Sequence, residues 1–279
     1  MKKINCQNVK MQLLKDLSLK MERKLSLAII KIGENKVSNI YLNSIKKIFE
    51  TYDVEIDVFS FSNDCKEKEI LSLIDELNSD LKVNGIMLLL PILADVDVKK
   101  LQNKIDFRKD IEGITQENYY QLQRGNGKIV SPVAKGVIDI INFYKIDVYL
   151  KKVTIISRST LIGKPLSYLF EFRGANVNVC HSRTKNIKDI LSNSDLIVTA
   201  TGKRDVVLSS FVKDDSVIID VGTEVLEDKI ISDLDENSFL NTNCLISNSP
   251  GGVGLLTTVN LLYNLGICYD LQFNNKKDN

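Results

Sequence analysis

A tyrosine and two lysines lie close together in SNIYLNSIKK (residues 38–47), a combination that can move protons. The segment is expected to be helical, and residues three or four positions apart share a face of a helix. Ile45 comes four residues after Tyr41, whereas Lys46 comes five after it and points well away at about 100° per residue. The segment is therefore either a catalytic helix without its amine or an ordinary surface helix.

Asp110 and Glu112 are a second candidate, because a pair of carboxylates can act as acid and base. The favoured interpretation of this stretch, however, is a solvated loop rather than a carboxylate pair. His181 is interpreted as a loop residue near a cofactor rather than a base, and Cys180 as a core residue rather than a nucleophile. The five cysteines show no CxxC pattern and there is one histidine, so we expect free thiols and no zinc site.

The segment SRSTLIGKPL (157–166) joins an expected strand to an expected helix, which is where open α/β sheets bind phosphates. Ser159 and the backbone amides near Gly163 are candidates for binding a pyrophosphate. The fork of Arg158 suits a phosphate on the adenosine ribose. The segment is not the GxGxxG fingerprint, since Ser157 stands where a glycine would be easier, and a plain capped helix is the alternative.

Two further turns, TATGKRD (199–205) and DVGTEV (220–225), also follow expected strands. Small residues such as Gly202 let a flat ring lie close to the backbone. Because the carboxyl ends of parallel strands meet at one edge, the three turns together favour a dinucleotide site. The glycines of SPGGVGLLTT (249–258) would let a ligand approach the backbone closely. Thr257 or Thr258 is available to cap the helix that follows. A plain helix-entry loop is the alternative there.

The elements that must position these residues alternate between strands and helices in both halves of the chain. This alternation predicts an α/β protein with an N-terminal α/β domain and a doubly wound, Rossmann-type domain. The expected strands are 26–33, 54–61, 85–91, 152–157, 175–180, 195–200 and 216–222, and the expected helices are 38–51, 66–79, 97–104, 135–145, 163–172, 186–194 and 255–266.

The composition narrows the possible functions. The 279 residues suffice for two domains, and an apolar content of 44% supports a real core. A net charge of +1 gives no electrostatic reason to expect nucleic acid or a membrane surface as a partner. No stretch is a leader peptide or reaches about 18 apolar residues, so we expect a cytoplasmic protein.

The order of the motifs resembles the methylenetetrahydrofolate dehydrogenase/cyclohydrolase family over nearly the whole chain. The segments that carry the resemblance are IGENKVSNIYLNSIKK, VNGIMLLLP, KDIEG, SRSTLIGKP, HSRTKN, TATGK, VIIDVG and SPGGVGLLT. The resemblance implies oxidation of 5,10-methylenetetrahydrofolate with NADP⁺ (NAD⁺ in some members), then addition of water to give 10-formyltetrahydrofolate. These reactions belong to one-carbon metabolism and purine biosynthesis.

The resemblance also implies how the chain is organised. Residues 1–130 would form a catalytic domain that is completed by the C-terminal helix at 255–279. Residues 131–254 would form the NADP-binding domain, with folate between the two, and the protein would be a homodimer. Tyr41 and Glu112 match catalytic positions. The full set of candidate residues is Ser157 (a glycine in the family), Arg158, Ser159, Gly163, Ser182, Thr201, Gly202 and Thr223 for the cofactor, and Tyr41, Pro250, Gly251, Gly252 and Thr257 for the substrate, with no metal.

The chain departs from the family pattern at several of these positions. The family's catalytic lysine is Ile45 here, its catalytic glutamine is Leu89, and its second aspartate is Glu112. Hydride transfer depends mainly on alignment and can survive these changes, whereas addition of water needs groups that move protons. We therefore expect a dehydrogenase with weak or lost cyclohydrolase activity. The alternatives are a degenerate protein that binds folate or nucleotide without turnover, and an unrelated nucleotide-dependent dehydrogenase.

Overall fold

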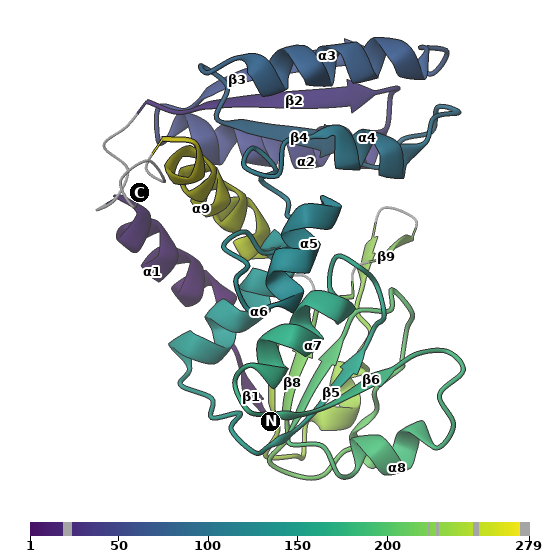
Figure 1. Cartoon of the computed structure of the whole chain (residues 1–279). Coiled ribbons are helices and arrows are strands. Elements are labelled where there is room, and N and C mark those ends of the chain that lie inside the picture. Colours follow the sequence, from purple (N-terminus) through teal and green to yellow (C-terminus); the bar gives the residue numbers. More distant parts are fainter. Residues whose placement is uncertain (19–23, 223, 227–228, 248–250, 274–279) are drawn as a thin grey trace. The chain divides into compact units, whose positions relative to one another are not determined.

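A computed structural model describes residues 1–18, 24–222, 224–226, 229–247 and 251–273 (Figure 1). The chain forms two compact units, each built on a parallel sheet. The three-stranded unit comprises residues 14–130 and 258–279, and the six-stranded unit comprises residues 1–13 and 131–257. The expected α/β fold with two parallel sheets is confirmed.

In the three-stranded unit, β2 (Ser26–Ile32) lies between β3 (Glu55–Phe61) and β4 (Gly85–Leu89), and both pairings are parallel. The chain moves across the sheet in one direction from β2 to β3 and in the other from β3 to β4. Because parallel crossovers are right-handed, α2 (Lys36–Glu50) and α3 (Glu67–Ser79) must lie on opposite faces of the sheet.

The two faces of this sheet are packed by different elements. On the α3 face, Ile30 and Leu88 pack with Ile74 and with Leu101 of α4 (Val98–Lys104). Alternation along β4 turns Gly85, Met87 and Leu89 to the other face. A Cβ added to Gly85 would lie 2.6 Å from a methyl carbon of Leu265, so this glycine lets α9 pack closely. The remaining helices connected with this unit are α1 (Cys6–Ser18), α5 (Gln116–Gln123) and α9 (Gly254–Phe273).

The six-stranded unit has the strand order β1-β11-β8-β7-β5-β6, with every neighbouring pair parallel. The chain runs from β5 to the edge strand β6 and then returns past β5 to β7, so the order reverses between β5 and β7. Ligands of open α/β sheets bind at the carboxyl ends of strands at such a reversal. The strands are β1 (Lys2–Lys3), β5 (Lys152–Ile156), β6 (Asn176–Cys180), β7 (Leu196–Thr199), β8 (Val217–Asp220) and β11 (Leu245–Ser247).

Buried apolar side chains from neighbouring strands form the core of this unit, among them Ile156, Ile197, Ile218 and Ile246. Its α-helices are α6 (Pro132–Phe143), α7 (Gly163–Glu171) and α8 (Ile187–Leu191), and a separate antiparallel pair is formed by β9 (Glu224–Leu226) and β10 (Lys229–Ile231). Two short 3-10 helices cover Ser209–Phe211 and Glu236–Phe239.

The structure differs from the sequence-based expectation in a few elements. Helix α1 and strands β1 and β11 were not expected, and α9 continues to Phe273 rather than ending near residue 266. Residues 1–13 pack with the six-stranded unit rather than with the first domain, because β1 forms a ladder with β11. No helix among the described residues has the length and apolar character needed to cross a bilayer.

Candidate active site

Helix α2 carries the first candidate residue and is fixed at its start by two contacts. The Asn35 side chain accepts hydrogen bonds from the backbone of Val37 (2.9 Å) and Ser38 (3.1 Å), which caps the helix. The Ser38 hydroxyl donates to the carbonyl oxygen of Leu90 at 3.0 Å. This contact holds the start of α2 against the end of β4. Tyr41 lies one turn further along α2 and is half-buried.

The two positions where the family has proton-transferring side chains, 45 and 89, hold buried hydrocarbon side chains in this chain. Ile45 is 0% exposed and Leu89 is 1% exposed. In the β2–β4 ladder Leu89 is paired with Lys31, whose ammonium group lies 2.7 Å from the carboxylate of Glu34. The side chain of Glu34 is 78% exposed, so the amine beside Leu89 is directed to a surface carboxylate. Helix α2 is therefore not a lysine-bearing catalytic helix at position 45.

The segment around Asp110 is ordered by its own side chains. Asp110 is fully buried and accepts hydrogen bonds from the backbone of Glu112 (3.2 Å), the backbone of Thr115 (2.8 Å) and the side-chain amide of Asn118 (2.9 Å). Gly113 has φ +65°, a conformation that glycine adopts without strain. The favoured expectation of a solvated loop is therefore wrong for Asp110, which acts as the acceptor around which the turn is built.

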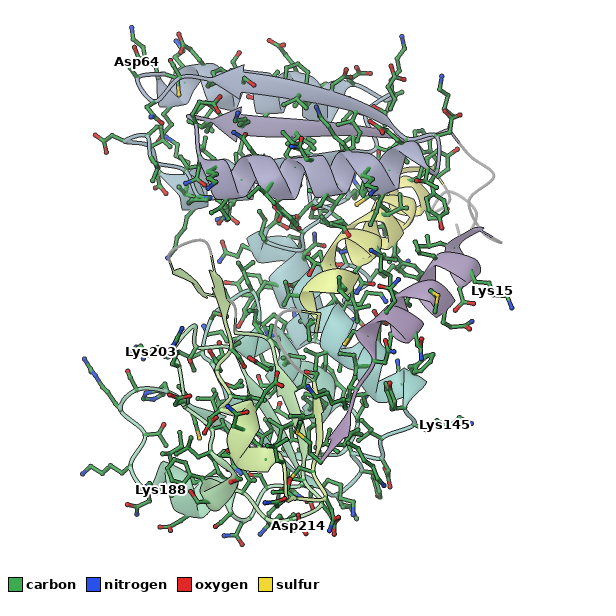
Figure 2. The ribbon with its side chains drawn as sticks, turned by 180° about the vertical axis from the view of Figure 1, so that it is seen from behind. Lys15, Asp64, Lys145, Lys188, Lys203 and Asp214 are labelled. Atoms are coloured by element: carbon green, nitrogen blue, oxygen red, sulfur yellow. The ribbon has the colours of Figure 1, made fainter. Side chains whose placement is uncertain are left out.

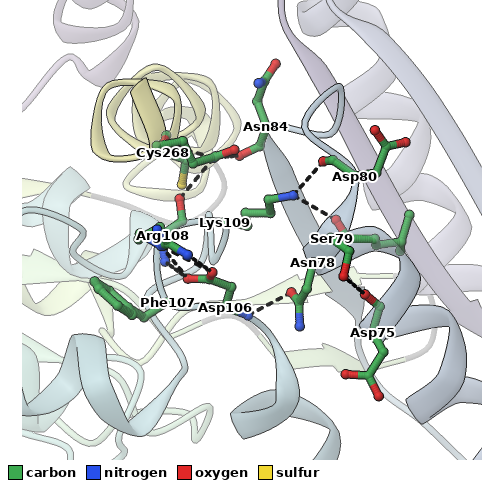
Figure 3. A network of polar contacts seen from close by, with 12 residues as sticks. Asp75, Asn78, Ser79, Asp80, Asn84, Asp106, Phe107, Arg108, Lys109 and Cys268 are labelled. Carbon is green, nitrogen blue, oxygen red and sulfur yellow. Dashed lines mark hydrogen bonds and ion pairs between the residues drawn. The ribbon is translucent and has the colours of Figure 1, made fainter. Parts of the chain in front are cut away.

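The chain leading into this turn is anchored by a buried lysine (Figure 3). Lys109 is 3% exposed and donates to the carbonyl oxygens of Leu77 (2.8 Å) and Asp80 (2.7 Å). Burial lowers the pKa of the Lys109 amine below its usual value. The backbone of Ile86 in β4 donates to the carbonyl oxygen of Lys109 at 2.7 Å, so the segment is joined to the sheet edge.

Glu112 carries the most unusual carboxyl group of the three-stranded unit. One of its carboxyl oxygens, Oε2, is buried without a hydrogen-bond partner among the described residues. Burial, and secondarily the charge of Asp110, raises the pKa of Glu112 to about 8. Burial and the nearby Glu112 also raise the pKa of the Tyr41 phenol. The charge of Glu112 therefore acts on the Tyr41 phenol. With a pKa of about 8, the Glu112 carboxyl is mostly protonated at neutral pH.

In the six-stranded unit, Ser157 follows β5 directly and is 9% exposed. The Ser159 hydroxyl accepts hydrogen bonds from the backbone of Ile162 (3.1 Å) and Gly163 (3.4 Å). A Cβ at Gly163 would lie 2.1 Å from the carbonyl oxygen of Ser157, so only glycine fits there. The Ser159 hydroxyl therefore binds two backbone amides where α7 begins, and one of them is the Gly163 amide that was expected to bind a phosphate.

The residues expected to bind the adenosine phosphate lie at neighbouring strand ends. Arg158 follows β5 and Ser182 follows β6, and both are exposed. His181 accepts a hydrogen bond from the backbone of Arg183 at its Nδ1 (3.1 Å), so this ring nitrogen carries no proton. Cys180 is buried in the core, and burial raises the pKa of its thiol. The expectation that Cys180 is a core residue is confirmed.

Two buried carboxylates at the ends of β7 and β8 escaped the sequence analysis. Asp233 binds the turn that contains Thr201 and Gly202, and Asp220 ends β8 and binds the backbone of Gly222 (2.9 Å). Burial is the main cause that raises the pKa of Asp220 to about 7. No local pattern distinguishes Asp233, because the turn that its carboxylate binds lies 30 to 34 residues earlier in the chain.

The glycine-rich segment before α9 is described only in part. Pro250 lies outside the described residues, as does Thr223, while Gly251 has φ +93° and is exposed. Helix α9 begins at Gly254, so Thr257 lies inside the helix and does not cap its start, contrary to expectation. Among the described residues no group of three His, Cys, Asp or Glu side chains could hold a metal ion.

Family models match both parts of the chain. Residues 2–112 match the tetrahydrofolate dehydrogenase/cyclohydrolase catalytic domain, and residues 131–273 match the tetrahydrofolate dehydrogenase/cyclohydrolase NAD(P)-binding domain. Among curated proteins, the bifunctional protein FolD of Clostridium acetobutylicum is 34% identical over 239 residues, covering 86% of each chain. The bifunctional protein FolD of Lactobacillus helveticus is 36% identical over 229 residues, covering 82% of this chain and 81% of its own length.

Solved structures agree with these matches. The bifunctional 5,10-methylenetetrahydrofolate dehydrogenase/cyclohydrolase from Thermoplasma acidophilum superposes with a TM-score of 0.93 at 29% identity, covering 98% of this chain and 100% of its own. The FolD enzyme of Campylobacter jejuni gives the same TM-score of 0.93 at 28% identity, also covering 98% and 100%. The resemblance inferred from the motifs is confirmed.

Proposed function

Because the chain belongs to the tetrahydrofolate dehydrogenase/cyclohydrolase family, we propose that it oxidises 5,10-methylenetetrahydrofolate to 5,10-methenyltetrahydrofolate with NADP⁺. The observation that carries the proposal is the set of turns at the reversal of the six-stranded sheet, where the SRSTLIGKP and TATGK segments follow β5 and β7. Such an edge is where open α/β sheets bind dinucleotides.

The oxidation transfers a hydride from the methylene carbon to the nicotinamide ring of NADP⁺. A folate nitrogen donates its lone pair, so the folate product is a cation and NADPH is formed. The protein's main task is to align the carbon, for which Tyr41 would stack on the folate.

Arg158 and Ser182 support NADP⁺ rather than NAD⁺ as the cofactor. Both are exposed, and each is the second residue after one of two neighbouring strands, β5 and β6. A guanidinium group and a hydroxyl at such positions can bind the phosphate on the adenosine ribose of NADP⁺. NAD⁺ lacks this phosphate and has an uncharged hydroxyl in its place, which a guanidinium group binds less strongly.

We further propose that the cyclohydrolase step is weak or lost. Addition of water to the methenyl carbon needs a group that takes up a proton, and such groups contribute about 10²–10⁴-fold. Ile45 and Leu89 are buried hydrocarbon, and the amine of Lys31 is paired with Glu34. Glu112 is mostly protonated at neutral pH, since its pKa is about 8, and a protonated carboxyl is a poor base.

A product assay tests both proposals. The full chain is given 5,10-methylenetetrahydrofolate and NADP⁺, and the absorbances of NADPH and of the methenyl product are followed. We expect NADPH to form and the methenyl compound to accumulate. Conversion to 10-formyltetrahydrofolate well above the spontaneous rate would contradict the loss of hydration. Binding of both ligands without NADPH would instead support the alternative of a binding protein without turnover.

Restoring two side chains should restore hydration. The double variant Ile45→Lys/Leu89→Gln supplies a buried amine and a hydrogen-bonding partner, so we expect hydration to rise by about 10²-fold or more. Ser44→Lys is the matched control, because it adds an amine to an exposed position on the same helix. Lys31→Met serves as a second control: if the unaltered chain hydrates and this variant does not, then Lys31 is the substitute amine.

We also infer a cytoplasmic homodimer. All five cysteines are free thiols and four of them are buried, which suits a reducing compartment. Light scattering on the purified chain tests the dimer, and a mass of one chain across the micromolar range would count against it.

A further inference from the structure

Asp233 is fully buried, and its carboxylate accepts four hydrogen bonds from one turn. On Oδ2 the donors are the Thr199 hydroxyl (2.6 Å), the Thr201 backbone (2.7 Å) and the Thr201 hydroxyl (2.9 Å). On Oδ1 the donor is the backbone of Lys203 (3.0 Å). One side chain therefore fixes the whole TATGK turn that follows β7.

The backbone of Asp233 also binds the far end of the same loop. Its carbonyl oxygen accepts a hydrogen bond from the backbone of Val206 at 2.9 Å. The next residue, Leu234, forms an isolated parallel bridge with Val207. The loop from Thr199 to Val207 is thus attached to Asp233 at both of its ends.

Asp233 is itself positioned by the end of β8. Its backbone donates to the carboxylate of Asp220 at 3.2 Å, and the Ser232 hydroxyl donates to the same carboxylate at 2.6 Å. A Cβ added to Gly222 would lie 2.0 Å from Oδ1 of Asp233, so the site leaves no room for a side chain at residue 222. The ends of β7 and β8 are therefore connected through two carboxylates, those of Asp233 and Asp220.

The same contacts decide which part of the turn remains for a ligand. The Thr201 hydroxyl proton goes to Asp233, and its oxygen accepts from the backbone of Lys203 at 3.1 Å. The Lys203 side chain is exposed and points outward (Figure 2). Gly202, at φ +66°, has no side chain and can approach a flat ring closely. The Thr201 hydroxyl is thus already engaged within the turn, by Asp233 and by the Lys203 backbone.

We propose that Asp233 is a positioning residue of the cofactor site: its carboxylate holds the turn at 199–203 in the conformation that receives the nicotinamide half of the dinucleotide. This inference rests on the proposed dehydrogenase function, in which Thr201 and Gly202 contact NADP⁺. Asparagine cannot replace the carboxylate, because its NH₂ group would face donors where an acceptor is needed.

The test compares cofactor binding, catalysis and stability in Asp233→Asn. We expect the KM for NADP⁺ and the Kd for NADPH, measured by fluorescence titration, to rise at least tenfold. The KM for methylenetetrahydrofolate should change less than threefold. Thr199→Val removes one of the four donors and should give a smaller loss of cofactor affinity. Gly222→Ala displaces the carboxylate without altering it and should resemble Asp233→Asn.

Asp214→Asn is the control for general destabilisation. Asp214 also joins distant segments, since it accepts hydrogen bonds from the backbone (2.7 Å) and side chain (2.8 Å) of Asn243, but it precedes β8 instead of following it. Figure 2 shows Asp214 and Lys203 at different ends of this unit. Asp214→Asn should lower the melting temperature without changing cofactor affinity.

The outcomes separate this inference from the proposed function. If the unaltered chain binds neither NADP⁺ nor NADPH, then the proposed function fails. If it binds them and Asp233→Asn binds them equally well, only the positioning role of Asp233 is overturned. Equal losses of affinity for cofactor and folate in the folded variant, or a loss of cofactor affinity in Asp214→Asn at similar stability, would also overturn it.

Discussion

At the scale of single residues, the three-stranded unit combines two buried hydrocarbon side chains with one buried acid. Ile45 and Leu89 are 0% and 1% exposed, and one oxygen of the Glu112 carboxyl lacks a hydrogen-bond partner among the described residues. A buried carboxyl without a cationic partner favours its neutral form. An isoleucine in place of a lysine at position 45 therefore fits with a protonated Glu112, and both features support the proposal that the chain has lost the addition of water and kept hydride transfer.

Arg158→Ala should change the choice of cofactor. We expect the KM for NADP⁺ to rise about tenfold or more while the KM for NAD⁺ stays nearly unchanged, because only NADP⁺ carries the phosphate that a guanidinium group binds. Steady-state kinetics with both cofactors provide the measurement. Arg124→Ala is the control, since Arg124 is an exposed arginine at the end of α5 in the other unit. Equal changes for NADP⁺ and NAD⁺ would argue against the assignment.

At the scale of elements, the connection from β5 to α7 depends on one glycine. Gly163 starts α7, and the space where its Cβ would stand is filled by the backbone of Ser157 and Arg158. Backbone cannot rotate away as a flexible side chain can. The first position of α7 therefore has to be a glycine, whichever side chain directly follows β5.

Gly163→Ala should destabilise the six-stranded unit and weaken cofactor binding together. We expect a loss of about 1–3 kcal/mol of unfolding free energy, typical of overpacking, measured by urea denaturation. Gly266→Ala is the matched control, because a Cβ at Gly266 in α9 would meet nothing within 4 Å. That variant should be neutral or up to about 1 kcal/mol more stable, since alanine favours helix. Similar losses in both variants would contradict the close contact at Gly163.

The sequence predicted the long, strongly patterned elements and failed where a structure depends on distant residues. β2 and β5 carry enough consecutive apolar residues to be recognised locally. β1 has two residues and β11 has three, so each is a strand only because the other elements of its sheet are present. The positions of Ile45 and Leu89 could be compared with a known family, whereas Asp233 acts through partners that no local pattern connects to it.

At the scale of the whole molecule, two buried acids connect folding to pH. Burial is the main cause that raises the pKa of Glu112 from 4.5 to about 8 and that of Asp220 from 3.8 to about 7. Below about pH 3 both groups are mostly neutral in the folded and in the unfolded chain, because the lower of their two ordinary pKa values is 3.8. As the pH rises from about 4 to about 8, the unfolded chain releases these protons while the folded chain keeps them, so stability falls.

Glu112→Gln should reduce this loss of stability at alkaline pH. Between pH 6 and pH 8.5 we expect the melting temperature of the unaltered chain to fall by roughly 5 °C more than that of the variant, measured by thermal denaturation. The comparison uses the difference between two pH values, so a constant effect of the new amide cancels. Glu117→Gln alters an exposed acid on the next helix and should leave the pH dependence unchanged. A parallel pH dependence in Glu112→Gln would refute the expectation.

The pairing of β1 with β11 has a consequence for synthesis on the ribosome. Lys2 and Lys3 can enter their sheet only after Leu245 and Ile246 have left the exit tunnel. Folding of the three-stranded unit is also completed late, because Asn264 of α9 donates to the carbonyl oxygens of Ile111 (2.8 Å) and Val130 (2.9 Å). Both sheets therefore expose apolar faces until translation of this region is nearly over, a period in which a nascent chain benefits from chaperones.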